Sequence, residues 1–168
     1  TPSPVVAFIV RTVDELLQRD FGLRDGLADR TTLQSKSGKP IHRLQILDPA
    51  TGTGTFLVDV VRAIYRKFVG QQGVWNDYVR NHLLPRLHGY EILMAPYAMA
   101  HLNLEYVFRE TGATNLGSAR YGIYLTNTLE NKRFDGNLFS PIDQEAQAAN
   151  VLKNSMRVMV MLGNPPYN

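Results

Sequence analysis

The residues best suited to catalysis stand near the end of the sequence, where Asn164, Pro165, Pro166 and Tyr167 follow an apolar run. The side-chain oxygen of Asn164 and the main-chain carbonyl of Pro165 can accept both hydrogens of a planar amine, which frees the nitrogen lone pair for attack on an electrophile. The prolines fix the direction of that carbonyl, and Tyr167 offers a face on which an extruded base can stack. We interpret this tetrapeptide as a candidate catalytic loop for an exocyclic amine; the alternatives are a rigid turn and a proline-rich ligand.

A glycine-rich turn occupies residues 48–54, "DPATGTG", between an apolar run and a helical pattern. Gly52 and Gly54 leave the backbone free to approach a ligand. Leu57 stands where a dinucleotide fingerprint needs a small residue, and no Lys followed by Ser or Thr closes the loop, which argues against NAD and against bound phosphates. Asp48 suits an ammonium group, such as that of the methionine part of S-adenosylmethionine. The alternative is a generic tight turn.

Two further polar residues follow apolar runs. Glu91, in "HGYEIL", can accept hydrogen bonds from two ribose hydroxyls, although an isolated Glu at a strand end is as readily solvated. Asn127, in "YLTNTL", can pair with an adenine amino group, and Leu129 can cover the ring. Taken alone, Asn127 is more typical of a turn.

Hydrophobic periodicity predicts the elements that must position these residues. Strands alternating with helices indicate an α/β fold with a parallel sheet covered on both faces. In such a sheet the carboxyl ends of the strands meet at one edge, so the tetrapeptide should lie beside the glycine turn. The expected strands are residues 44–47, 87–91, 121–125 and 157–162; the expected helices are residues 5–19, a helix from the glycine turn to about Gly70 and Gly73, one opened by Pro96 with Met99, Leu102 and Tyr106 on one side, and residues 140–154. Residues 31–43 are predicted to be a loop.

Composition sets broader limits. The 168 residues are 44% hydrophobic, which fits one domain, and the absence of cysteine excludes disulfides and thiolate metal sites. The net charge of +3 is scattered and does not by itself indicate nucleic acid. The apolar runs are shorter than the roughly 20 residues of a membrane span, and the four histidines share no metal-ligand spacing. We expect a soluble, cytoplasmic protein without a metal.

Taken in order, "TPSPVVAFIV", "LDPATGTGTFL", "HGYEIL", "YLTNTL" and "GNPPYN" resemble the adenine-specific DNA methyltransferases that modify the N-6 amino group. The stretches "LLPRLHGYEILMAPYAMAHLNL" and "IYLTNTLE" are most similar to the methyltransferase module of type ISP restriction-modification enzymes. The resemblance implies a Rossmann-like fold that uses S-adenosylmethionine, of which this chain holds the first four strands. It also implies double-stranded DNA as the substrate and helicase and nuclease domains fused to the module.

The same resemblance assigns roles by position. Residues 1–30 would form a helical motif that closes over the cofactor, and residues 44–168 would form the Rossmann-like core. Asn127 stands where many relatives have Asp. The implied cofactor-binding residues are Thr1, Pro2, Asp48, Pro49, Ala50, Thr51, Gly52, Gly54, Phe56, Glu91, Ile92, Asn127, Thr128 and Leu129.

Two alternatives stay open at this point. A methyltransferase acting on the glutamine amide of a protein would use the same Asn-Pro-Pro-Tyr device, and a nonenzymatic nucleotide-binding or scaffold domain would use neither motif chemically. Because a target recognition domain is not part of the sequence, we expect the fragment to be inactive alone and to lack sequence-specific DNA binding. Calorimetry with S-adenosylmethionine distinguishes the nonenzymatic alternative.

Overall fold

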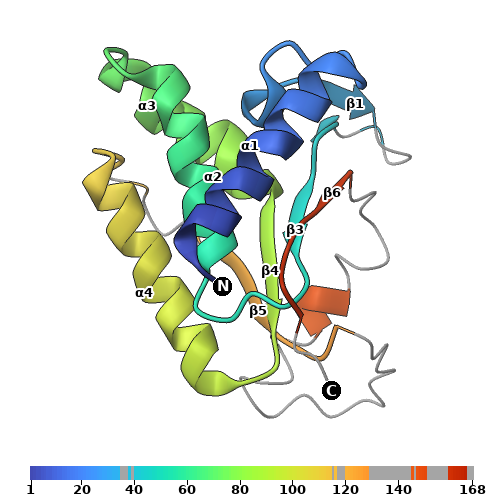
Figure 1. The fold of residues 1–168 in the computed structure, drawn as a ribbon, viewed down its shortest axis with the longest axis vertical. Helices are drawn as coiled ribbons and strands as arrows, with labels where there is room; N and C mark the ends of the chain where they lie inside the picture. Colours follow the sequence, from blue (N-terminus) through green and yellow to red (C-terminus); the bar gives the residue numbers. More distant parts are fainter. Residues whose placement is uncertain are drawn as a thin grey trace.

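The structure, a computed structural model, describes residues 1–34, 38, 40–114, 116, 120–128, 145, 147–150 and 159–165. Its centre is a four-stranded parallel sheet in the order β5-β4-β3-β6 (Figure 1). The strands are β3 (Ile46–Asp48), β4 (Leu87–Glu91), β5 (Gly122–Leu125) and β6 (Val160–Met161). Ile46 pairs with Leu87 on one side and with Val160 on the other, so the carboxyl ends of all four strands reach the same edge. The predicted order of strands along the chain is confirmed.

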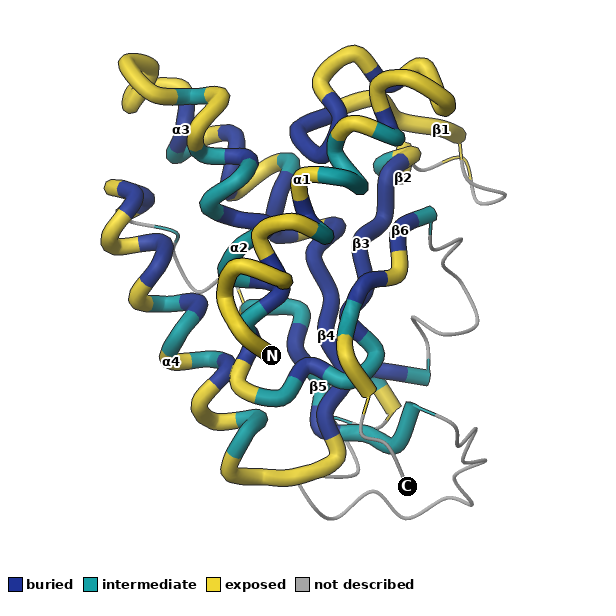
Figure 2. Tube along the Cα trace, in the orientation of Figure 1, coloured by how far each residue is buried: buried dark blue, intermediate teal, exposed yellow. Residues whose placement is uncertain are grey.

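Helices cover one side of this sheet, with α2 lying between α1 and α4 (Figure 1). They are α1 (Ser3–Arg19), α2 (Thr55–Tyr65), α3 (Gln72–Tyr78) and α4 (Met94–Glu110), joined by the short helical turns η1 (Gly26–Ala28), η2 (Arg66–Phe68), η3 (Val79–Leu83) and η4 (Leu84–Arg86). In α1, Pro4 occupies the first turn, where its missing N–H costs nothing, and Val6 and Val10 recur at helical spacing and are buried. Figure 2 shows buried residues concentrated on β3 and β4. The main hydrophobic core therefore lies between the sheet and this helical layer.

The opposite face of the sheet is also covered. Ile46 belongs to the main core, whereas its neighbour Leu47 belongs to a second cluster, because successive side chains of a strand point to opposite faces. In that cluster Leu47 and Tyr90 pack with Ala149, which lies in the helical residues 147–150. The predicted α/β fold with helices on both faces is thus confirmed. Most of the predicted helix 140–154 lies outside the described residues.

The prediction of a loop over residues 31–43 was wrong. The segment contains an antiparallel hairpin of β1 (Thr32–Gln34) and β2 (Pro40–His42), in which Thr32 pairs with His42. Each strand has three residues and is largely exposed, whereas the alternation that signals a strand extends over roughly four to eight residues.

The prediction that Gly73 ends a helix was also wrong, since Gly73 lies inside α3. Trp75 and Tyr78 are the two buried side chains of this helix, and both pack against the ring of Phe68. Burial of two large aromatic side chains outweighs the roughly 1 kcal/mol that glycine costs in a helix.

Helix α4 begins where expected, but its buried side is not the one formed by Met99, Leu102 and Tyr106. Those three side chains are exposed, and the buried side chains are Ala100, Leu104, Val107 and Phe108. Apolar residues occur around most of this helix, so periodicity alone does not select a face. Among the residues that the structure describes, no helix is long and apolar enough to cross a membrane.

Candidate active site

The carboxyl edge of the sheet brings together parts of the chain that are far apart in sequence. Asn164, beyond β6, donates a hydrogen bond from Nδ2 to the hydroxyl of Thr1 at a distance of 2.9 Å. Thr128, beyond β5, donates from its hydroxyl to the carbonyl of Pro49 in the glycine turn. The first residue, the glycine turn and the loops after β5 and β6 therefore meet. The predicted neighbourhood is observed for Asn164; Leu129, Pro166 and Tyr167 lie outside the described residues.

Gly163 is the residue that lets the loop after β6 lie against the glycine turn. A Cβ atom at this position would lie 2.5 Å from Oδ1 of Asp48 and 3.3 Å from Cδ of Pro49. No side chain fits there without a shift of one of the two loops. Our sequence reasoning overlooked Gly163, although a glycine between an apolar strand and a rigid tripeptide is itself a sign of close approach.

The glycine turn has a fixed backbone conformation. Gly52 has a φ of 55° and Gly54 a φ of 84°, values in the left-handed region that residues with a side chain rarely adopt. Gly54 precedes α2, and a Cβ atom on it would lie 3.3 Å from the Cα of Ala100 in α4. Asn103 of α4 donates from its side chain to the carbonyl of Thr53 at 2.9 Å. Helix α4 therefore holds the turn in place through this close contact and this hydrogen bond. No sequence motif indicates the role of Asn103.

Thr51 is bonded within the turn itself. Its backbone N–H donates to the carbonyl of Tyr90, and its buried hydroxyl donates to the carbonyl of Asp48. A side chain on Gly89 would collide with this hydroxyl. Phe56 is likewise buried in the main core. These two side chains support the turn from inside, whereas Pro49 and Ala50 are partly exposed at its surface.

Glu91, at the end of β4, is buried and already holds three backbone donors. Its Oε2 accepts the N–H of Gly52 at 2.7 Å, and its Oε1 accepts the N–H groups of Ile92 and Leu93 at 2.8 and 2.9 Å. A carboxylate has about four acceptor positions, so about one remains, on Oε2. We predicted that Glu91 accepts hydrogen bonds from two ribose hydroxyls. The structure leaves an acceptor position for one such hydrogen bond.

Asp48 differs most from what its position in the sequence suggests. Its side chain is fully buried; Oδ1 accepts the N–H of Ala50, and Oδ2 has no hydrogen-bond partner among the described residues. The pKa of Asp48 is raised to about 7, chiefly by burial and less by the charge of Glu91, while the bond from Ala50 opposes the shift. An uncompensated carboxyl oxygen at this edge fits a cationic or hydrogen-bond-donating ligand group.

The other residues predicted to form the site lie near the carboxyl edge of the sheet. Thr1, Pro2, Asn164 and Pro165 are exposed, Ile92 is exposed directly after Glu91, and Asn127 is half-buried just beyond β5. In the described ranges no group of three or more His, Asp and Glu side chains is arranged to hold a metal ion.

These features define an α/β protein with a parallel sheet and an Asn-Pro loop at its carboxyl edge, which is the edge where such folds commonly bind ligands. The family model for N-6 DNA methylases matches residues 1–168, and the chain belongs to that family. Comparison with curated protein sequences gave no significant match.

Comparison with solved structures also relates the chain to restriction-modification enzymes. The chain is similar over its full length to the ATP-dependent Type ISP restriction-modification enzyme LlaBIII bound to DNA, with 30% identity and a TM-score of 0.77. For a nuclease-deletion mutant of the Type ISP enzyme LlaGI in complex with a DNA substrate mimic, the identity is 29% and the TM-score is 0.77. For the DrdV–DNA complex, the identity is 30% and the TM-score is 0.69. The chain spans only 10%, 12% and 14% of these three chains. The resemblance to Type ISP methyltransferase modules is confirmed.

Proposed function

We propose that this chain is the cofactor-binding part of a DNA methyltransferase that transfers a methyl group from S-adenosylmethionine to the exocyclic amino group of adenine. The observation that carries the proposal is the contact of Asn164 with Thr1, together with the close approach of Gly163 to Asp48. These contacts bring the loop after β6 beside the glycine turn, which supports an amine-accepting role for Asn164 next to a bound cofactor. Family membership and the DNA-bound enzymes of similar structure support adenine in double-stranded DNA as the substrate.

S-adenosylmethionine, when bound, supplies the electrophilic methyl group. The amide of Asn164 has its nitrogen engaged by Thr1, which leaves its oxygen as the group that accepts one hydrogen of the adenine amine. The carbonyl of Pro165 would accept the other hydrogen, which would leave the nitrogen lone pair free to attack the methyl group that the cofactor would supply. The proton displaced from nitrogen passes to solvent. Pro166 and Tyr167 would complete the loop, with Tyr167 stacking on the extruded base.

The other site residues follow from the geometry of the turn. Asp48 would face the ammonium group of the methionine part, which Thr1 and Pro2 would also contact, and Gly52 and Gly54 would let the ligand approach the backbone. Glu91 would accept one ribose hydroxyl through Oε2. The further proposed contacts are Pro49, Ala50, Ile92, Asn127, Thr128 and Leu129; Thr51 and Phe56 would act by shaping the turn.

We also propose that the parent enzyme is a cytoplasmic restriction-modification protein in which helicase, nuclease and target recognition functions are fused to this module. The small share of each similar chain that this sequence spans, and the DNA bound in all three complexes, support this view.

Isothermal calorimetry tests the cofactor assignment. We expect S-adenosylmethionine to bind and Glu91→Gln to weaken this binding about tenfold or more. The amide NH2 of Gln would face backbone N–H donors, and the site would lose a charged acceptor worth about 1.5–3 kcal/mol. Glu15→Gln, an exposed change on α1, is the matched control and should leave the affinity unchanged. Tight binding of NADH, with no heat from S-adenosylmethionine, would contradict the proposal.

A further inference from the structure

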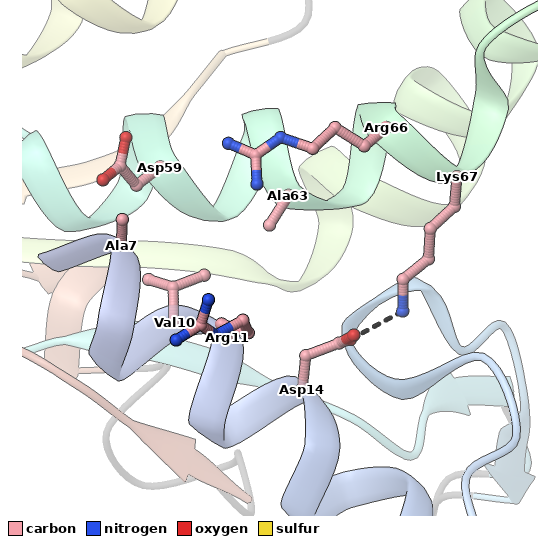
Figure 3. Close-up of a pocket in the computed structure, with 8 residues that line it drawn as sticks. All are labelled: Ala7, Val10, Arg11, Asp14, Asp59, Ala63, Arg66 and Lys67. Atoms are coloured by element: carbon pink, nitrogen blue, oxygen red, sulfur yellow. Dashed lines mark hydrogen bonds and ion pairs between the residues drawn. The ribbon is translucent and has the colours of Figure 1, made fainter. Parts of the chain in front are cut away.

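A cavity of about 240 Å³ lies between α1 and the end of α2, and none of its lining residues belongs to the proposed active site (Figure 3). Its lining residues are Ala7, Val10, Arg11, Asp14, Asp59, Ala63, Arg66 and Lys67. Ligand pockets for drug-sized molecules measure roughly 300–1,000 Å³. This cavity is therefore large enough for one side chain and too small for a nucleotide.

The charges around the cavity are not balanced. Asp14 is bonded by Lys67 at 2.7 Å and by the backbone N–H of Leu27, and Asp59 lies 3.8 Å from Arg62. Among the described residues, the side chain of Arg66 takes part in no hydrogen bond or ion pair, and its charge lowers the pKa of Asp59 less than burial raises it. Both carboxylates therefore have other partners, and a guanidinium group remains available.

Arg11 faces the same cavity and is held only weakly. Its guanidinium lies 4.0 Å from Glu15, and both side chains are about 70% exposed, a geometry in which an ion pair contributes little. Figure 3 shows the guanidinium groups of Arg11 and Arg66 on the two sides of the space between the helices, with Ala63 and Val10 between them. Two planar donors above an apolar floor suit a carboxylate carried on methylene groups.

The surface beside Arg11 is apolar. The ring of Phe8 is 59% exposed, lies 5.9 Å from the guanidinium carbon of Arg11, and is joined along α1 by Val5, which is 47% exposed. Exposed aromatic residues next to arginine are enriched in protein–protein interfaces and at their energetic centres. A phosphate backbone would gain nothing from Val5 and Phe8, whereas apolar neighbours of a peptide carboxylate would cover both side chains.

We propose that this cavity is a docking site for an acidic protein segment. One Asp or Glu carboxylate of the partner enters between Arg11 and Arg66, and apolar neighbours in that segment cover Val5 and Phe8. The charge complementarity of the two guanidinium groups identifies the partner chemistry, and the proposal does not depend on the methyltransferase assignment.

NMR of the arginine Nε–Hε groups tests this directly. The chain is titrated with the peptide acetyl-Leu-Glu-Leu-amide and separately with acetyl-Leu-Gln-Leu-amide, which differs only in charge. We expect the Glu peptide to shift the signals of Arg11 and Arg66 saturably and the Gln peptide to bind about tenfold more weakly or worse, which corresponds to ~1.4 kcal/mol. Equal affinity for both peptides, or no saturable shift, would overturn the proposal.

Variants and competing ligands complete the test. Arg66→Gln and Arg11→Gln should each weaken Glu-peptide binding about tenfold, whereas Arg109→Gln, which removes an exposed arginine paired with Glu105 on α4, should not. The backbone amide NMR spectrum away from each substitution should be the same in all three variants, which shows that they are folded. If inorganic phosphate binds saturably and more tightly than the Glu peptide, the cavity is a phosphate site. If the signals of Arg11 and Arg66 shift with protein concentration in the absence of peptide, the cavity is a contact between copies of the chain. Either result contradicts the proposal.

Discussion

Replacing Gly163 with alanine should separate methyl transfer from cofactor binding. The new Cβ would lie 2.5 Å from Oδ1 of Asp48, whereas an unstrained carbon–oxygen contact is about 3.3 Å, so one loop has to move by roughly 0.8 Å. Asp48 is buried and held by the N–H of Ala50, but Asn164 and Pro165 are exposed, so we expect the loop after β6 to move. A misplacement of about 1 Å can lower a rate about 100-fold.

The assay is transfer of a radiolabelled methyl group to adenine-containing duplex DNA by an enzyme that includes this chain. We expect kcat to fall about 30- to 100-fold in Gly163→Ala. Because the glycine turn should keep its shape, the affinity for S-adenosylmethionine should change less than about threefold, which corresponds to ~0.7 kcal/mol. Gly73→Ala is the matched control, because a Cβ there meets no atom within 4 Å and alanine favours the helix. Wild-type turnover by Gly163→Ala would refute the assignment of Gly163 as the residue that seats the catalytic loop.

Three further changes test other parts of the structure. Asn164→Ala should abolish methylation and leave cofactor affinity measured by calorimetry unchanged; residual turnover above about 1% of wild type would count against the amine-acceptor role. Burial raises the pKa of Asp48 from 3.8 to about 7, so the folded state keeps a proton that the unfolded chain releases between those values, and stability should fall as the pH rises from about 4 to 7. Asp48→Asn should abolish that decline and be roughly 2–4 kcal/mol more stable than wild type at pH 8; parallel urea-denaturation profiles of the two proteins against pH would disprove it. Arg86→Met should lower the free energy of unfolding by about 2–4 kcal/mol, because the buried Arg86 donates to the carbonyls of Leu27 and His82 and to the hydroxyl of Tyr78, which would lose their donor; a change below 0.5 kcal/mol would contradict this account.

Local patterns in the sequence were sufficient to predict the fold and to bring the candidate site residues to one edge of its sheet. The glycine turn follows a buried strand, Glu91 ends the next one, and the tetrapeptide follows the last, so the rule that parallel strands end together predicts their meeting. Turn chemistry and strand patterning depend on neighbours within a few residues, which is why they can be read directly. The exposed hairpin at residues 31–43 has no such pattern and was missed.

Only the tertiary structure decided how the site residues are used. The buried carboxyl of Asp48, the three backbone donors on Glu91, the close approach of Gly163 and the clamp by Asn103 all arise between segments that are distant in sequence. The same holds for the exposed side of α4 and for the two arginines at the α1–α2 cavity. Burial and hydrogen-bond partners depend on which surfaces pack together, and that information is not contained in the identity or spacing of any single residue.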